Sequence, residues 1–174
     1  MIYFKKFTAD DIPQLIKWIN AGSEEEMFLW SGITFTFPID EKQLLNYAGE
    51  SDAEIYSIWS SDHHPCGHAA LRKIDNDHRS ARIGKLFIAP EYRGLGMTPV
   101  ILQKLLYHSF YVLNLNRVGL GVFADNERAL SIYRQFGFHI DGRLRDHRRI
   151  NDRYIDLIEM SVLYREFTNR CRSL

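Results

Sequence analysis

The stretch EYRGLGMTPVILQKLL, Glu91 to Leu106, joins a short glycine-bearing turn directly to an amphipathic helix. Glycine permits a positive φ and lets a ligand approach the backbone closely. The first N–H groups of a helix lack internal partners and carry the positive end of its dipole. Arg93 adds a cation beside them. The stretch therefore predicts an anion site suited to a phosphate, although a plain turn has the same pattern. It is neither a Walker loop nor a GxGxxG dinucleotide fingerprint.

Strand-like and helical patterns alternate on both sides of this turn. A strand at 2–7 precedes two helices, one with Ile12, Leu15, Ile16 and Ile19 on one face and one capped by Asp40. The later strands are expected at 53–60, 67–74, 80–90, 117–123, 138–149 and 153–163, with a further helix at 126–136. This order predicts an α/β (α+β) fold with a mixed, mostly antiparallel sheet of about seven strands and about four helices on its faces. We expect a single domain over 1–174.

Composition narrows the class of protein. Apolar residues make up 45% of the 174 residues, enough for a sizeable core. Lys+Arg equals Asp+Glu at 22 each, which argues against broad capture of nucleic acid or an anionic membrane. Cys66 and Cys171 lie far apart in the sequence. A disulfide between them is one interpretation, but two reduced thiols are the simpler one. With no signal-like or membrane-length apolar run, we expect a soluble cytoplasmic protein.

A second pattern, NERALSIYRQFGF, follows the strand at 117–123. Asn126 suits a helix N-cap, and Tyr133 lies two turns later on the same face. Gly137 is expected to end this helix in a left-handed conformation. A cap, a core tyrosine and a glycine stop explain each residue alone, but not their position roughly thirty residues after the Arg-Gly turn.

Three segments in order, PEYRGLGMT, NERALSIYRQFGF and DGRLRDHRRINDRYIDLIEMSVL, resemble the GNAT superfamily of N-acetyltransferases. The resemblance covers roughly Pro65 to Phe167. It is greatest to the RimJ/RimL-like branch of ribosomal-protein N-terminal acetyltransferases and to spermidine acetyltransferases. It implies a GNAT fold with a sheet splayed at its centre, acetyl-CoA as cosubstrate and no metal. Because many relatives dimerise, it also leaves a homodimer open.

The resemblance implies a binding site for acetyl-CoA. In relatives the matching turn wraps the pyrophosphate, largely through backbone N–H groups. Here that role falls to Arg93, Gly94, Leu95, Gly96, Met97 and Thr98. Thr98 departs from the usual Gly or Ala, but its hydroxyl suits a phosphate oxygen. Phe87 and Ile88 are expected to pair with the pantetheine arm. Gly119 and Gly121 would then admit this arm beside the next strand, unless a bulky neighbour packs over them.

The implied reaction is direct attack of a primary amine on the thioester through a tetrahedral intermediate. Tyr133 is expected to protonate the leaving thiolate, and Asn126 to contact the cofactor or an ordered water. Backbone N–H near Ile88 would polarise the thioester carbonyl. An aliphatic amine with a pKa of about 10.4 is neutral about once in 2,500 molecules at pH 7, so the reaction needs a base.

The sequence leaves this base open. Many relatives carry a glutamate in the strand before the turn, where this chain has Arg82. Arginine does not act as a base. The candidates are a water wire, His68, and one of the three glutamates at 24–26. His68 has a suitable intrinsic pKa, but an ordinary strand histidine would look the same. The departure at Arg82 also leaves open a catalytically weak acetyl-CoA-binding sensor.

The candidate acceptor-binding residues are Glu24, Glu25, Glu26, Trp30 and Phe35. The acids could attract a cationic amine, and the aromatic rings could line an apolar or cation–π pocket. A solvated charged turn and ordinary core packing explain the same residues equally well. The resemblance implies an amine acceptor and leaves open whether it is a protein N-terminus, a polyamine or another small amine.

Two further groups of residues, one basic and one of histidine and cysteine, suggest other kinds of binding site. Basic residues alternate along one strand face at 143–149, which leaves open a protein or RNA interaction domain. His63, His64 and Cys66 lie close in sequence, but no second ligand pair completes a metal site.

Overall fold

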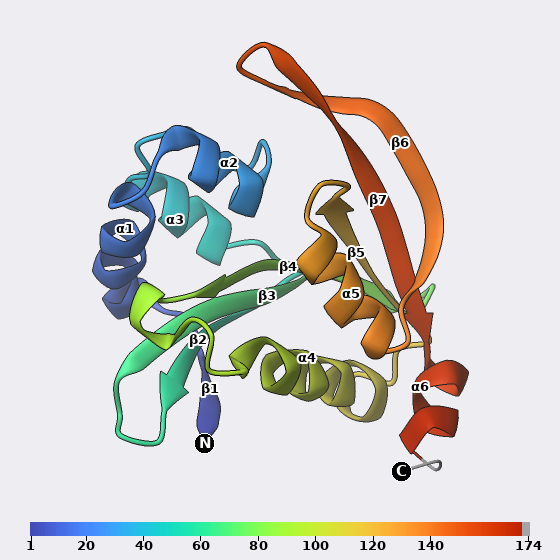
Figure 1. Ribbon diagram of the computed structural model, residues 1–174. Helices are drawn as coiled ribbons and strands as arrows, with labels where there is room; N and C mark the ends of the chain where they lie inside the picture. The colour runs from blue at the N-terminus through green and yellow to red at the C-terminus, as the bar shows by residue number, and fades with distance from the viewer. Residues whose placement is uncertain (172–174) are drawn as a thin grey trace. The chain divides into compact units, whose positions relative to one another are not determined.

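The computed structural model describes residues 1–171, with side chains through Asn169, so the thiol of Cys171 lies outside the described side chains. Figure 1 shows the elements. The strands are β1 (Ile2–Lys6), β2 (Glu54–Ser60), β3 (Pro65–Asp75), β4 (Ser80–Ile88), β5 (Arg117–Phe123), β6 (His139–Ile150) and β7 (Arg153–Leu163). The helices are α1 (Ile12–Asn20), α2 (Glu24–Ser31), α3 (Glu41–Ala48), α4 (Met97–Tyr107), α5 (Glu127–Gln135) and α6 (Tyr164–Cys171).

All seven strands belong to one sheet in the order β1-β2-β3-β4-β5-β7-β6. The pairs β1–β2, β2–β3, β5–β7 and β6–β7 are antiparallel. β4 and β5 run parallel, with Ser80 to Arg82 opposite Arg117 to Gly119. The prediction of a mixed, mostly antiparallel sheet of about seven strands is confirmed.

The chain forms two compact units, each described here by itself. The first consists of Met1–Arg72 and Gly84–Met97, and the second of Lys73–Ile83 and Thr98–Leu174. β3, β4 and α4 each run from one unit into the other. Arg93 to Met97 of the glycine turn and the candidate acceptor residues belong to the first unit, whereas Thr98, Asn126 and Tyr133 belong to the second.

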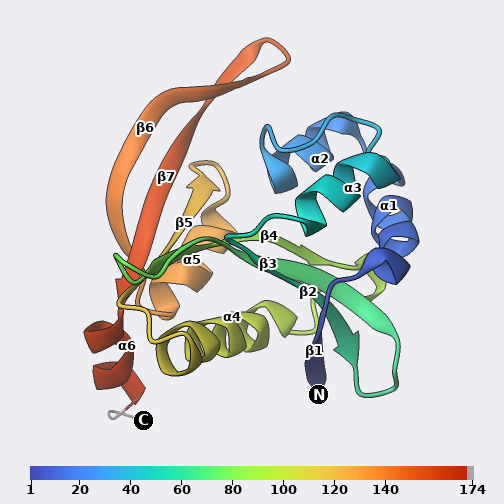
Figure 2. The same cartoon turned by 180° about the vertical axis from the view of Figure 1, so that it is seen from behind.

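The core of the first unit lies between its helices and its strands. Figure 2 shows β1, β2 and β3 from behind, with α1 and α3 nearby. The predicted apolar face of α1 is confirmed, because Ile12, Leu15 and Ile19 are buried and Ile16 packs, partly buried, against the same core. The buried cluster comprises Phe7, Ile12, Leu15, Ile19, Met27, Phe35, Ile39, Leu44, Tyr47, Ile55 and Ala70. Asp40 caps α3 as predicted, accepting a hydrogen bond from the Gln43 backbone at 2.8 Å.

The structure has six α-helices in residues 1–171 rather than the expected four, because α2 and α6 were not foreseen. α2 begins with a capping box. Ser23 Oγ accepts from the Glu26 backbone N–H at 3.1 Å, and Glu26 Oε2 accepts from the Ser23 N–H at 2.8 Å. The three glutamates at its start lie at the positive end of its dipole. The spacing Ser-x-x-Glu was the sequence signal for this helix.

In the second unit, α4 buries four aliphatic side chains completely: Ile101, Leu102, Leu105 and Leu106. α5 ends as predicted. Gly137 has φ 84°, and the Phe138 N–H donates to the Tyr133 carbonyl at 3.1 Å. α6 packs its Phe167 ring 5.3 Å from Phe110.

Candidate functional site

The glycine turn has the geometry that a phosphate site needs. Gly94 has φ 80° and Gly96 has φ 70°, a region that favours glycine, and α4 begins immediately afterwards at Met97. A Cβ built on either glycine would meet no atom within 4 Å. The backbone of this turn is therefore open to a ligand, and it lies beside helix N–H groups that have no partner within the helix. These residues fit the pyrophosphate of acetyl-CoA.

Arg93 stabilises the turn in addition to giving it a positive charge. Its Nε donates to the Ile88 carbonyl at 3.1 Å, and its guanidinium lies 5.6 Å from the centre of the Phe87 ring. The side chain is therefore folded back onto the end of β4. Its terminal N–H groups are the ones that could reach a phosphate. Leu95 is 69% exposed.

β3 approaches β4 closely at a glycine that the sequence analysis did not single out. A Cβ on Gly67 would lie 2.6 Å from the Phe87 carbonyl oxygen, closer than real Cβ atoms come. The Ala89 N–H donates to the Cys66 carbonyl at 3.0 Å in the same region. Burial raises the pKa of the Cys66 thiol to about 11, so this thiol is unreactive at neutral pH. Gly67 thus fixes the position of the strand expected to hold the pantetheine arm.

His68 lies in the core of the first unit. It is 1% exposed, its Nε2 lies 3.0 Å from the Tyr47 hydroxyl, and its ring meets the Phe7 ring edge-on at 5.0 Å. Burial, and then the nearby Lys85 cation, lower its pKa to about 3. An imidazole with so weak a proton affinity is a poor base near pH 7. The sequence revealed the intrinsic pKa of His68 but not its burial, and we do not propose it as the base.

The aromatic candidates pack together in the same unit. Trp30 stacks on Phe35 with ring centres 5.6 Å apart, and it meets the His68 and Phe87 rings edge-on at 6.2 Å. Phe35 is only 7% exposed and belongs to the core cluster. The Trp30 Nε1–H is buried and has no acceptor among the described residues. Core packing explains Phe35, whereas the indole N–H of Trp30 retains an unused donor.

The glutamates at 24–26 are part of a helix start rather than a loop. Glu26 uses its carboxylate in the capping box, Glu24 is exposed, and Glu25 is partly buried. The first unit as a whole is acidic, with seven Lys and Arg against twelve Asp and Glu, a net charge of −5. The second unit has fifteen Lys and Arg against ten Asp and Glu, a net charge of +5. The zero net charge of the chain is therefore the sum of an acidic unit and a basic unit.

Lys85 is a functional candidate that the sequence analysis missed. This β4 residue has φ 53°, which is uncommon for a residue other than glycine. Its Nζ donates to the Ser31 carbonyl at 2.6 Å and to Thr34 Oγ1 at 2.7 Å. Burial, and then the Arg72 cation, lower its pKa to about 8. A lysine within an apolar strand was the available sequence signal.

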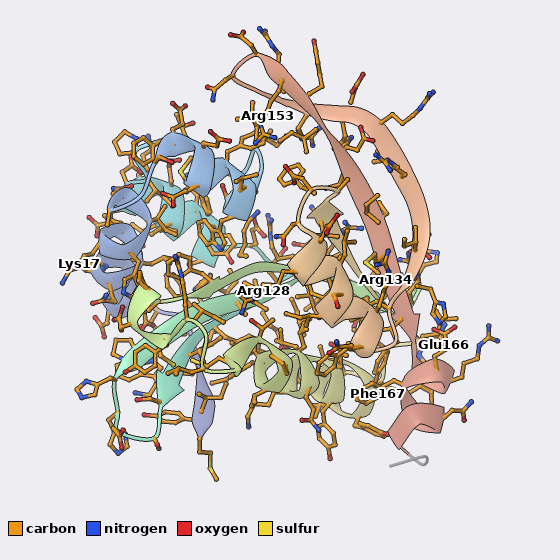
Figure 3. All side chains as sticks on the ribbon, in the orientation of Figure 1. Lys17, Arg128, Arg134, Arg153, Glu166 and Phe167 are labelled. Carbon is orange, nitrogen blue, oxygen red and sulfur yellow. The ribbon has the colours of Figure 1, made fainter. Side chains whose placement is uncertain are left out.

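In the second unit, α5 presents the two predicted cofactor contacts. Asn126 caps the helix as expected, with Oδ1 accepting from the Ala129 N–H at 3.1 Å. Tyr133 packs 5.8 Å from the Phe138 ring, and burial raises its pKa. The Tyr133 phenol therefore keeps its proton at neutral pH. Figure 3 labels two other residues of α5, Arg128 and Arg134.

Arg82 forms an ion pair across β5. Its Nη2 lies 2.8 Å from one Glu159 carboxylate oxygen and 3.1 Å from the other. A Cβ on Gly121 would lie 3.4 Å from this guanidinium, and a Cβ on Gly119 would lie 3.8 Å from it. The guanidinium thus covers the two β5 glycines, which supports the simpler interpretation that a bulky neighbour packs over a thin strand.

The described residues contain no group of three His, Cys, Asp or Glu side chains placed to hold a metal ion. Within the same part of the chain, no helix is long and apolar enough to cross a membrane.

Comparison with known proteins gives consistent results. The family model described as "Acetyltransferase (GNAT) family" matches residues 20–138. Spermidine N(1)-acetyltransferase of Vibrio cholerae is 36% identical over 60% of this chain and 60% of its own length. The Escherichia coli K12 protein of the same name is 33% identical over 61% of this chain and 56% of its own. The matches therefore span less than two thirds of these relatives.

A solved structure aligns over more of the chain. The crystal structure of spermidine N-acetyltransferase from Vibrio cholerae, in complex with CoA and spermine, covers 97% of this chain and 98% of its own chain. Its TM-score is 0.84 at 25% sequence identity.

Proposed function

Because the chain belongs to the acetyltransferase (GNAT) family, we propose that it transfers the acetyl group of acetyl-CoA to a primary amine of a polyamine. The glycine turn is the observation that carries this proposal. Gly94 and Gly96 both have positive φ and open space where a Cβ would stand, directly before α4. This backbone suits a diphosphate, which is the part of acetyl-CoA that the turn would hold.

Two observations favour a polyamine over the other amines. The relatives described above are named spermidine N-acetyltransferases. The unit that carries the candidate acceptor residues has a net charge of −5, and an acidic field attracts a polycation. A single protein N-terminus or a free amino acid carries less positive charge and gains less from this field.

Each residue has a defined task in the reaction. The amine nitrogen attacks the thioester carbonyl carbon, a C–N bond forms and the C–S bond breaks. The amine must lose a proton, and the thiolate must gain one. Tyr133 retains its phenolic proton because its pKa is raised, so it can protonate the sulfur. The Asn126 side-chain NH₂ is the group left for the cofactor, because Oδ1 caps α5.

The test is release of CoA thiol across a panel of amines: spermidine, a peptide with an unblocked N-terminus, free amino acids and an aminoglycoside. We expect the highest kcat/KM for spermidine. A higher value for the peptide would move the acceptor to protein N-termini. Tight binding of acetyl-CoA with no thiol release from any amine would replace the enzyme with an acetyl-CoA sensor.

A further inference from the structure

We propose that Lys85 is the general base that takes the proton from the attacking amine. This inference rests on the proposed acetyl transfer and adds the base that the reaction requires. Two of the earlier candidates are engaged elsewhere, because His68 is buried against Tyr47 and Glu26 caps α2.

The position of Lys85 joins the donor strand to the candidate acceptor segment. Lys85 stands two residues before Phe87, in the strand expected to hold the pantetheine arm. Its Nζ contacts Ser31 and Thr34, the immediate neighbours of Trp30 and Phe35. Nζ also lies 6.0 Å from the centre of the Phe35 ring. The positive φ of Lys85 is a strained conformation, of the kind that persists at functional sites.

The number of hydrogen bonds suits a neutral amine. A neutral lysine amine has two N–H donors and one lone pair, whereas the ammonium form has three donors. The Ser31 carbonyl and Thr34 Oγ1 accept two N–H donors, a number that the neutral amine supplies while its lone pair remains able to take a proton.

Burial and the nearby charges set the pKa of Lys85. Burial lowers this pKa most, Arg72 of β3 lowers it further, and Glu50 after α3 raises it, while His68 of β3 is neutral. Arg72 and Glu50 pair with each other, with Nε to Oε2 at 2.7 Å. With a pKa of about 8, half of Lys85 is neutral at pH 8. An ordinary lysine would be neutral about once in 300 molecules there.

The proton balance closes with groups already described. The acceptor ammonium gives one proton to Lys85, and its nitrogen then attacks the carbonyl carbon. The C–S bond breaks, and Tyr133 gives its proton to the sulfur. The second proton leaves the nitrogen through water and restores Tyr133. Lys85 returns its proton to solvent before the next turnover.

The test compares Lys85→Arg and Lys85→Gln with Lys17→Arg. Lys17 is an exposed lysine of α1 in the same unit, and its side chain extends outward in Figure 3. Both Lys85 variants keep N–H donors for Ser31 and Thr34, but neither side chain accepts a proton near pH 8. The readouts are kcat/KM for spermidine between about pH 6 and pH 10, and acetyl-CoA affinity by calorimetry.

We expect both Lys85 variants to lose about 10²–10⁴-fold in kcat/KM with unchanged acetyl-CoA affinity, while Lys17→Arg matches the wild type. The ratio of wild-type to variant rates should rise with pH through the pKa of Lys85 and then level off. The protonation of spermidine changes with pH in the same way for every variant, so it cancels in this ratio. The remaining pH dependence of the ratio belongs to Lys85. If Lys85→Arg has the wild-type rates and pH profile, Lys85 is not the base and only holds the segment at Ser31 and Thr34 in place.

Two further results separate the remaining explanations. If the variants fail to bind acetyl-CoA, the NMR titration of isotope-labelled lysine in the wild-type protein decides. A Lys85 pKa near 8 supports the base, and an ordinary lysine pKa overturns it. A wild-type protein that releases no thiol with any amine overturns the proposed function and the base together. An active wild type with unaffected variants overturns the base alone.

Discussion

Lys85→Met should change how the stability of the first unit depends on pH. The pKa of Lys85 falls from 10.5 to about 8 on folding, so the folded state binds fewer protons than the unfolded state between these values. Unfolding free energy therefore rises with pH over this window, and the cost of the buried cation is fully present below pH 8. At about 1.4 kcal/mol per pKa unit the cost is about 3 kcal/mol. Partial exposure of the side chain to water reduces it to about 1–2 kcal/mol.

The substitution removes this cost and also two hydrogen bonds worth about 1 kcal/mol each, so little net change is expected at pH 7. The informative quantity is the pH dependence, measured by urea unfolding at pH 7 and pH 10. Relative to Lys85→Met, the wild type should gain about 1–2 kcal/mol over this interval. Lys17→Met, at an exposed position, should follow the wild type. The same pH dependence in wild type and Lys85→Met would show that folding does not lower the pKa of Lys85.

Four other substitutions test single features of the structure. Gly96→Val places a branched side chain at φ 70° on the open face of the turn, and should abolish acetyl-CoA binding in calorimetry while the fold persists by circular dichroism. Tyr133→Phe should lower kcat about 10²-fold or more without changing acetyl-CoA affinity; unchanged turnover would exclude it as the acid. Gly67→Ala should cost about 1–3 kcal/mol in urea unfolding, because its Cβ would lie 2.6 Å from the Phe87 carbonyl oxygen. Ser23→Ala should cost about 1 kcal/mol through the lost cap of α2, and a change below about 0.3 kcal/mol would contradict that cap.

The elements that were predictable are those whose pattern is local. Alternation placed the seven strands, and apolar spacing placed α1, α4 and α5. Caps at Asp40 and Asn126 and the stop at Gly137 were also foreseen, because each depends on residues three or four apart. α2 was missed although its capping box has the same local character, because its acids and aromatics were interpreted as a pocket.

The site was predictable only where its chemistry depends on the backbone. The glycine turn could be identified because positive φ restricts the residue type. The pKa values of His68 and Lys85 could not be foreseen, because they depend on burial in the folded core and on cations such as Lys85 and Arg72 that only the fold brings close. Likewise, nothing local showed that Glu159 would pair with Arg82 over the β5 glycines.

The central claim is that this chain moves an acetyl group from acetyl-CoA to a polyamine. The most direct measurement is mass spectrometry of spermidine after incubation with the protein and acetyl-CoA deuterated in its acetyl group. We expect spermidine carrying one deuterated acetyl group, formed at a rate proportional to enzyme concentration. Unmodified spermidine, with acetyl-CoA either intact or hydrolysed, would contradict it.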